Sequence, residues 1–304
     1  MTFFIEVTIS GLLAGVMYSL VALGFVMIYK ASGVFNFAQG AMVLFAALTF
    51  VSILEKVLAM GWPLWVAVGA IFLLSFVVMI LLATAIEWVV LRPLVARPPI
   101  ILFMATIGLG FFLEGLGQGI WGAEVHGLDI GIPDNPAEWL MDKGLVISQF
   151  DMVAAFVAAI LVVVLVFFFQ KTRTGRALRA VSDDHEAALS VGIPLRWIWG
   201  ITWGIAGLIA LVAGILWGTR LGVQYSISLI VLKALPVLIL GGLDSITGAI
   251  IGGLIIGSSE KLAEVYIGDL VGGGIENFFP YLLAMVFLWF RPHGLFGKEI
   301  IERV

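Results

Sequence analysis

Long apolar runs dominate the chain, and short segments between them carry most of its polar residues. A helix that crosses a bilayer needs about 20 apolar residues, and nine of the runs approach or exceed this length. They cover residues 5–29, 38–56, 63–90, 99–121, 149–170, 198–219, 226–243, 246–265 and 277–291. The pattern predicts an all-α polytopic membrane protein with about eight or nine transmembrane helices.

Two of these spans depart from the pattern of a regular membrane helix. The span 226–243 is short and contains Pro236, and the span 246–265 is rich in glycine. Transporters often interrupt a helix at glycine or proline. Either span is therefore predicted to be broken, half-length or re-entrant, and the glycines around Glu114 in "IGLGFFLEGLGQGIW" predict a further irregular helix.

The composition supports a membrane protein and excludes several classes of site. Of the 304 residues, 62% are hydrophobic and 12% are charged, against about 25% charged in a soluble domain. The chain has no cysteine, and its three histidines are scattered, so the sequence predicts no metal site. It contains neither a G-x-x-x-x-G-K-[ST] phosphate loop nor an H-E-x-x-H motif. We expect no enzymatic activity, no bound cofactor and no nucleic-acid partner.

The placement of charge predicts the orientation. Basic residues crowd the connection 171–197 and the C-terminal tail, whereas the segment 122–148 carries five acidic residues and one lysine. Because cytoplasmic loops are enriched in lysine and arginine, 171–197 is predicted to be cytoplasmic and 122–148 external. Nine spans then place the N-terminus outside and the C-terminus inside. No soluble domain is expected, so residues 1–304 form a single transmembrane domain.

A few polar residues lie at membrane depth and are candidates for a substrate pathway. Asn36 and Gln39 stand beside small residues where one apolar run gives way to the next, and Glu114 and Lys233 interrupt apolar runs. Polar groups in hydrocarbon are costly unless they have partners or face a cavity. The amides fit a re-entrant turn or an ordinary turn that caps a helix. Glu114 and Lys233 could line the pathway, extend their charged ends toward the membrane surface, or form an ion pair with each other.

The segment "TGRALRAVSDDHEAALSVGIP" is the most polar part between two spans. Its arginines form a basic stripe suited to lipid phosphates or an acidic partner. Ser182 or Asp183 is predicted to cap a short helix that ends at Gly192 and Pro194. Such a helix is marginal without a surface to pack against, so it lies on its own protein or on lipid, or docks a soluble partner.

Four stretches together resemble one family. "GRALRAVSDDHEAALSVGI" is similar to the cytoplasmic loop of LivH/LivM-type permease subunits of branched-chain amino acid ABC transporters. "GLLAGVMYSLVALGFVMIYKASGVFNFAQGAM" resembles that family's opening span, with Gln39 where many members carry histidine. "LKALPVLILGGLDSITGAIIGGLIIG" and "RPHGLFG" resemble its late segment and its terminus. The four matches occur in the family's order along the chain.

The resemblance implies a permease that forms half of a pore in a bacterial inner membrane. Its partners would be a second related permease, two cytoplasmic ATPase subunits that bind ATP, a periplasmic or surface solute-binding protein and membrane lipid. The implied substrate is a branched-chain amino acid, with urea or a short amide as the alternative. The alternative hypotheses from other functional classes are a secondary transporter, a channel and a membrane scaffold. The residues expected to dock the ATPase are Arg176, Arg179, Asp183, Asp184, Glu186, Ala187, Ala188, Leu189 and Gly192.

Overall fold

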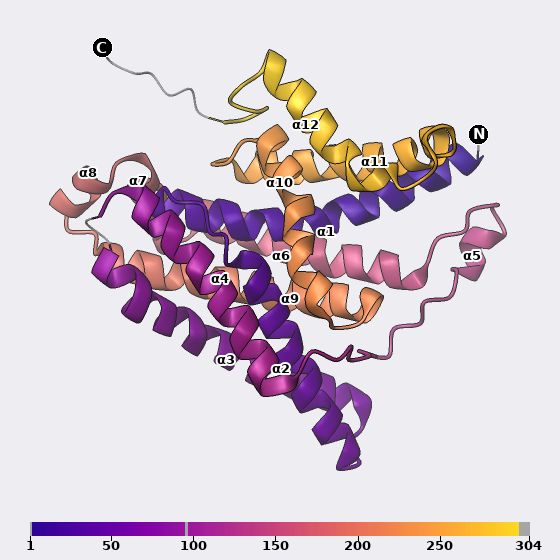
Figure 1. Ribbon diagram of the computed structural model, residues 1–304, viewed down its shortest axis with the longest axis horizontal. Helices are drawn as coiled ribbons and strands as arrows, with labels where there is room; N and C mark the ends of the chain where they lie inside the picture. The colour runs from indigo at the N-terminus through magenta and orange to yellow at the C-terminus, as the bar shows by residue number, and fades with distance from the viewer. Residues whose placement is uncertain (1, 95–96, 298–304) are drawn as a thin grey trace. The chain divides into compact units, whose positions relative to one another are not determined.

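The computed structural model describes residues 2–94 and 97–297, and helices form most of this part (Figure 1). The first half contains α1 (Thr2–Ser32), α2 (Gln39–Ala59), α3 (Leu64–Ile86), η1 (Glu87–Leu91), η2 (Arg92–Leu94), α4 (Pro99–Trp121) and α5 (Glu138–Met141). The second half contains α6 (Gln149–Lys171), α7 (Arg173–Asp183), α8 (His185–Ser190), α9 (Leu195–Leu221), η3 (Tyr225–Leu229), α10 (Ile230–Gly241), α11 (Ile246–Val271), η4 (Ile275–Asn277) and α12 (Phe279–Phe290).

The all-α polytopic prediction is confirmed. Within the described residues, 7 helices are long and apolar enough to cross a membrane, namely α1, α2, α3 with its continuation to Leu94, α4, α6, α9 and α11. The apolar segments Tyr225–Gly241 and Phe279–Phe290 are shorter. They correspond to the predicted spans 226–243 and 277–291, and Pro236 lies inside the shorter helix α10.

Two predicted irregularities are wrong. The glycine-rich span 246–265 is a continuous helix, α11, that runs on to Val271, and Glu114 lies in the continuous helix α4. Glycine weakens a helix in water, but in hydrocarbon an unpaired backbone group is costlier, so the helical hydrogen bonds persist. The irregular backbone occurs in α3 instead, which passes into the π-helical turn η1.

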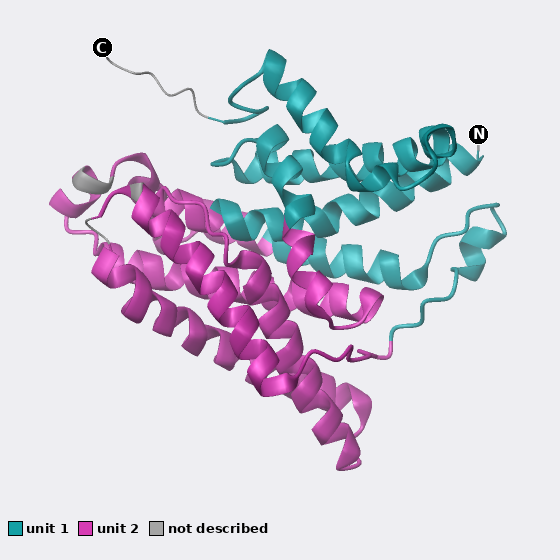
Figure 2. Cartoon of the chain, in the orientation of Figure 1, with its two compact units in different colours: residues 1–26, 132–163, 232–304 teal, residues 27–131, 164–231 magenta. Residues whose placement is uncertain are grey.

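The chain divides into two compact units, each assembled from separate parts of the sequence (Figure 2). Unit 1 contains Met1–Val26, Ile132–Val163 and Leu232–Val304, and unit 2 contains Met27–Gly131 and Val164–Val231. Helices α1, α6 and α10 each contribute residues to both units.

Unit 1 is packed through glycine. A Cβ atom at Gly257 of α11 would lie 2.5 Å from the Gly11 carbonyl oxygen and 2.5 Å from the Gly15 Cα of α1. The Ser19 hydroxyl of α1 also lies 3.1 Å from the Ile250 carbonyl oxygen of α11. Lipid provides no hydrophobic drive between helices, so this close backbone contact supplies the attraction.

Unit 2 is built around α2 and α9. Helix α2 packs against α3, α4, α9 and η3, and α9 also packs against α3. A Cβ atom at Gly214 of α9 would lie 2.6 Å from the Val43 carbonyl oxygen of α2, so the two backbones pass at close range. This packing fixes α9, whose N-terminal end leads into the polar segment that the sequence singled out.

Candidate functional site

The polar segment folds into two helices that stand at the end of α6. Helix α7 begins after Thr172, whose hydroxyl accepts a hydrogen bond from the Gly175 amide at 2.9 Å. Gly175, Leu178 and Val181 form its buried face, and the other face is polar. A Cβ atom at Gly175 would collide with the Phe168 and Phe169 carbonyl oxygens, so glycine allows α7 to sit on the last turn of α6.

Arg179 holds this arrangement together. Its guanidinium donates hydrogen bonds to the carbonyl oxygens of Phe169 (2.7 Å) and Gln170 (3.4 Å), which lie in the last turn of α6. The same side chain lies 5.9 Å from the centre of the Phe169 ring, and Lys30 of α1 lies 5.5 Å from it. A cation on the free carbonyls of a helix C-terminus is stabilising. Arg179 therefore links α7 to α6, and the exposed Arg176 adds a longer hydrogen bond to the Lys171 carbonyl oxygen at 3.4 Å.

The cap of α8 differs from the prediction. Asp183 ends α7, and Asp184 caps α8 by accepting a hydrogen bond from the Ala187 amide at 3.0 Å. Because α7 runs through Ser182 and Asp183, neither can be the cap of the next helix. The side chain of Glu186, one of the predicted docking residues, lies outside the described part of the structure.

The predicted C-terminal end of α8 is confirmed. Gly192 has a φ of 85°, and the Ile193 amide donates to the Ala188 carbonyl oxygen at 3.0 Å. This six-to-one bond closes a Schellman motif. The motif needs one residue in the left-handed backbone conformation, which glycine adopts without strain. Pro194 follows, and α9 begins at Leu195.

The exposed apolar surface of α8 includes the predicted docking residues Ala187 and Leu189 but not Ala188. Ala188 is buried, with 3% of its surface exposed, whereas Leu189 is 54% exposed and Val191, just after the helix, is 80% exposed. Ala187 is exposed as well. Val191 was absent from the predicted docking residues, although its place before Gly192 in the Schellman motif puts it at the tip of the turn.

The break between α1 and α2 pairs both candidate amides inside unit 2. Asn36 and Gln39 are fully buried. The Asn36 side chain accepts a hydrogen bond from the Ala38 amide (3.1 Å) and donates to the Gln39 side-chain oxygen (3.3 Å). Gln39 in turn donates to the Ala206 carbonyl oxygen of α9 at 3.4 Å. The amides thus form a turn that is tied to α9, and their place on a substrate pathway stays a prediction.

Two residues that the sequence did not reveal complete this break. The Trp199 indole of α9 donates a hydrogen bond to the Ala31 carbonyl oxygen at 2.9 Å, just before the break. The Thr106 hydroxyl of α4 accepts one from the Phe37 amide at 3.2 Å, within the break. Helix α9 is therefore bonded on both sides of the break, at Ala31 and at Gln39. These contacts join residues more than 60 positions apart, so no local pattern could signal them.

The charged candidates have separate surroundings. In unit 2, the carbonyl oxygen of Glu114 accepts a hydrogen bond from the Tyr225 hydroxyl. In unit 1, Lys233 forms an ion pair with Glu260 at 2.7 Å, and the Tyr18 hydroxyl donates to the same Glu260 oxygen at 3.2 Å. The partner of Lys233 is thus Glu260 rather than Glu114. A role for Glu114 or Lys233 in the pathway stays a prediction.

Because α11 extends to Val271, Glu260 lies within the helix and only 1% of its surface is exposed. Its second carboxylate oxygen has no hydrogen-bond partner among the described residues. No three His, Cys, Asp or Glu side chains gather into a potential metal site anywhere in residues 2–94 and 97–297.

Comparison with known proteins places this arrangement in one family. The model of a family described as "Branched-chain amino acid transport system / permease component" matches residues 7–289. The chain belongs to this family. It is a permease component and a multi-pass membrane protein.

The relatives cover almost the whole chain. The chain is 30% identical to the high-affinity branched-chain amino acid permease BraD of Pseudomonas aeruginosa, over 99% of this chain and 98% of that one. It is 28% identical to LivH of Escherichia coli K12 over the same shares. It is also 29% identical to a probable LivH of Methanocaldococcus jannaschii, over 92% of this chain and 88% of that one. Among solved structures, PsaBC from Streptococcus pneumoniae matches with a TM-score of 0.42 and 15% identity, over 94% of this chain and 89% of that chain.

The Lys233–Glu260 pair yields a prediction about stability. Lys233→Met leaves a buried carboxylate without its cation, and we expect it to lower the free energy of unfolding by about 3 kcal/mol. The double variant Lys233→Met/Glu260→Gln should be more stable than Lys233→Met, since the orphaned charge is gone. Thermal unfolding of the purified protein measures both.

The pair between Lys261 and Glu276 is the matched control, because it has a similar length (2.8 Å) and both side chains are about one-third exposed. Lys261→Met should cost about 1 kcal/mol or less. Equal losses in the two lysine variants would contradict a desolvated Lys233–Glu260 pair.

Proposed function

We propose that the chain forms half of the translocation pathway of an importer for branched-chain amino acids in a bacterial inner membrane. Two cytoplasmic ATPase subunits bind and hydrolyse ATP, so this chain performs no chemistry and binds no cofactor. A second related permease completes the pathway, and a solute-binding protein delivers the substrate. The near full-length similarity to LivH and BraD, named for branched-chain amino acid transport, supports this substrate.

The orientation follows from the charge pattern. The segment with α7 and α8 is cytoplasmic because it carries the densest cluster of arginines, and the acidic segment 122–148 is external. The N-terminus then lies outside and the C-terminus inside. This orientation places α8 on the side where ATPase subunits are found.

The short helix α8 carries the docking proposal. It is capped at both ends, its small Ala188 lies against the protein, and Leu189 and Val191 project from it. Two exposed apolar side chains on a rigid two-turn element are suited to a groove in a soluble partner, where their burial contributes about 1.5–3 kcal/mol each. Ala187 and the exposed Asp183 and Asp184 border them.

Movement at α8 can reach the α1–α2 break through α9. Only Gly192, Ile193 and Pro194 separate the docking tip from α9. Helix α9 holds the break on both sides, through Trp199 at Ala31 and through Ala206 at Gln39. A displacement of α9 by the ATPases therefore pulls on both sides of the break, at Ala31 and at Gln39, which is a means of alternating access to the pathway.

We expect Val191→Glu to reduce co-purification of the ATPase subunits at least tenfold, because a carboxylate would enter an apolar groove. Transport in membranes should fall in proportion. Val125→Glu is the matched control, since Val125 is also exposed (61%) but lies in the segment proposed to be external. If ATPases are retained by Val191→Glu as by the control, α8 is not the docking element.

Trp199→Phe tests the transmission step. The substitution leaves α8 intact but removes the hydrogen bond to the buried Ala31 carbonyl oxygen, which is worth about 1–3 kcal/mol. We expect uptake to fall about fivefold while ATPase co-purification is unchanged. Trp65→Phe, at an indole that is 72% exposed, should leave both quantities unaltered. Full uptake by Trp199→Phe would contradict the proposed route through α9.

The substrate proposal is tested with the assembled transporter in proteoliposomes. ATP-dependent uptake of labelled leucine should be inhibited by excess unlabelled isoleucine and valine, and not by urea or acetamide. Inhibition by urea or acetamide alone would instead favour the amide-type importer. Uptake by this chain without ATPases or ATP would overturn the proposal of an ATP-driven importer and indicate a secondary transporter or channel.

A further inference from the structure

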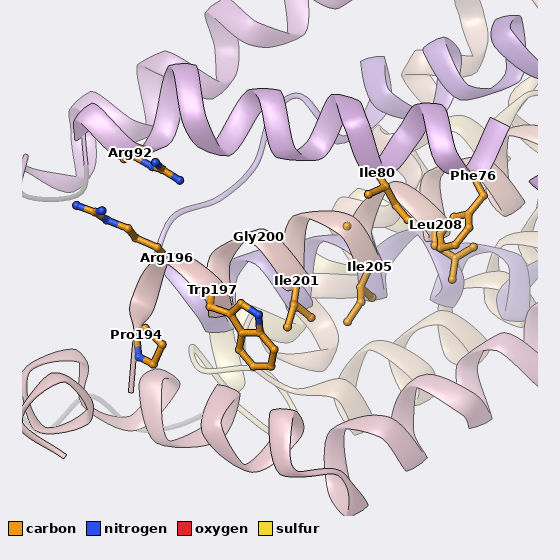
Figure 3. Close-up of a pocket in the computed structure, with 11 residues that line it drawn as sticks. Phe76, Ile80, Arg92, Pro194, Arg196, Trp197, Gly200, Ile201, Ile205 and Leu208 are labelled. Atoms are coloured by element: carbon orange, nitrogen blue, oxygen red, sulfur yellow. The ribbon is translucent and has the colours of Figure 1, made fainter. Parts of the chain in front are cut away.

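An open groove lies between α3 and α9 within unit 2 (Figure 3). It has a volume of about 640 Å³. Its walls are apolar and come from both helices, with Phe76, Ile80, Trp197, Ile201, Ile205 and Leu208. None of the residues already assigned to docking or to the α1–α2 break lines it.

Two glycines form the floor of the groove. Gly200 and Gly204 lie one turn apart on α9, and a Cβ atom at either position would have no neighbouring atom within 4 Å. These glycines differ from Gly214 of the same helix, which is pressed against α2. The groove is therefore space that the described residues of this chain leave open.

Positive charge marks one end of the groove. Arg92 and Arg196 lie at the same end, and Phe76 and Leu208 lie at the other (Figure 3). Arg92 is ion-paired with Glu87 at 2.9 Å, so its charge is largely balanced. Arg196 is exposed and forms no hydrogen bond or ion pair with the described residues. This end of the groove thus has an excess of one positive charge, and the guanidinium of Arg196 has donors available for a ligand.

The dimensions fit half of a bilayer. Arg196 and Leu208 are 12 positions apart on α9, or about 18 Å at 1.5 Å per residue. One leaflet of the hydrocarbon core is about 15 Å thick. A groove that begins at two arginines thus extends from the headgroup level to about the middle of the membrane.

A narrow occupant suits the groove best. A volume of about 640 Å³ over about 18 Å gives a mean cross-section of about 36 Å². A helix with side chains has a diameter of at least about 10 Å and a cross-section of about 80 Å². A single hydrocarbon chain is narrower and can lie along the groove between α3 and α9.

We propose that this groove binds one anionic phospholipid of the cytoplasmic leaflet. One acyl chain lies over Gly200 and Gly204, and the phosphate binds the guanidinium of Arg196 beside Arg92. Guanidinium groups match phosphate oxygens in two-point hydrogen bonds, and basic pockets between membrane helices favour anionic headgroups. Trp197, exposed beside Arg196, has the amphipathic ring that is typical of the membrane interface.

Native mass spectrometry of the purified transporter complex tests the site. Phosphatidylglycerol and phosphatidylcholine with identical acyl chains are added, and bound lipid is counted. We expect about tenfold tighter binding of phosphatidylglycerol to the unmodified chain. Arg196→Gln should abolish this preference, since a charge-assisted hydrogen bond is lost. Arg173→Gln, the same change at an exposed arginine of α7, should preserve it.

Gly204→Leu is the second variant, and it fills the groove while both arginines remain. Because its Cβ meets no atom, the fold should persist, and phosphatidylglycerol binding should fall about tenfold. Equal binding to the unmodified chain, Arg196→Gln and Gly204→Leu would overturn the proposal. Displacement of the lipid by millimolar inorganic phosphate would overturn it in favour of a free-anion site. Loss of the second permease from Gly204→Leu with unchanged lipid binding would overturn it in favour of a subunit interface.

Discussion

Every interruption of a membrane helix exposes backbone groups that hydrocarbon cannot solvate, and this constraint shapes the structure. At the α1–α2 break, Asn36, Thr106 and Trp199 supply the missing hydrogen bonds. At the end of α6, Arg179 and Thr172 donate to the last carbonyl oxygens. Helix α8, proposed to lie outside the hydrocarbon, ends in a Schellman motif around Gly192. Several polar side chains of unit 2 thus act where helices stop, and these are also the places where the chain can change direction.

The partners of these breaks lie on other helices, and α9 supplies several of them. It follows directly from the proposed docking tip and is bonded to the residues before and after the α1–α2 break. Three of its glycines show two kinds of surroundings. Gly214 brings α9 against α2, whereas Gly200 and Gly204 leave an open channel toward α3. One helix therefore combines a fixed packing face with a face that has room for a lipid chain. Glycine allows close contact on the first face and leaves open space on the second.

The sequence was informative where a signal is local. The length of the apolar runs predicted the helical spans, Gly192 and Pro194 predicted the end of α8, and four ordered stretches predicted the family. Prediction from the sequence failed where packing against other segments determines the cap of a helix or the burial of a side chain. Asp184 rather than Ser182 or Asp183 caps α8, because α7 packs on α6 and so extends to Asp183. Ala188 is buried because the surrounding fold covers it, and composition alone could not distinguish it from the exposed Ala187.

By itself, the sequence determined the class of protein, the positions of its long helices and the family, since all of these depend on hydrophobic length and on short motifs. Only the tertiary structure decided that α11 is continuous, that Lys233 pairs with Glu260, that Asn36 and Gln39 are tied to α9, and that Gly200 and Gly204 face open space. A polar or small residue in hydrocarbon must find its partner on another helix. Which helix that is depends on packing between segments that are distant in the sequence.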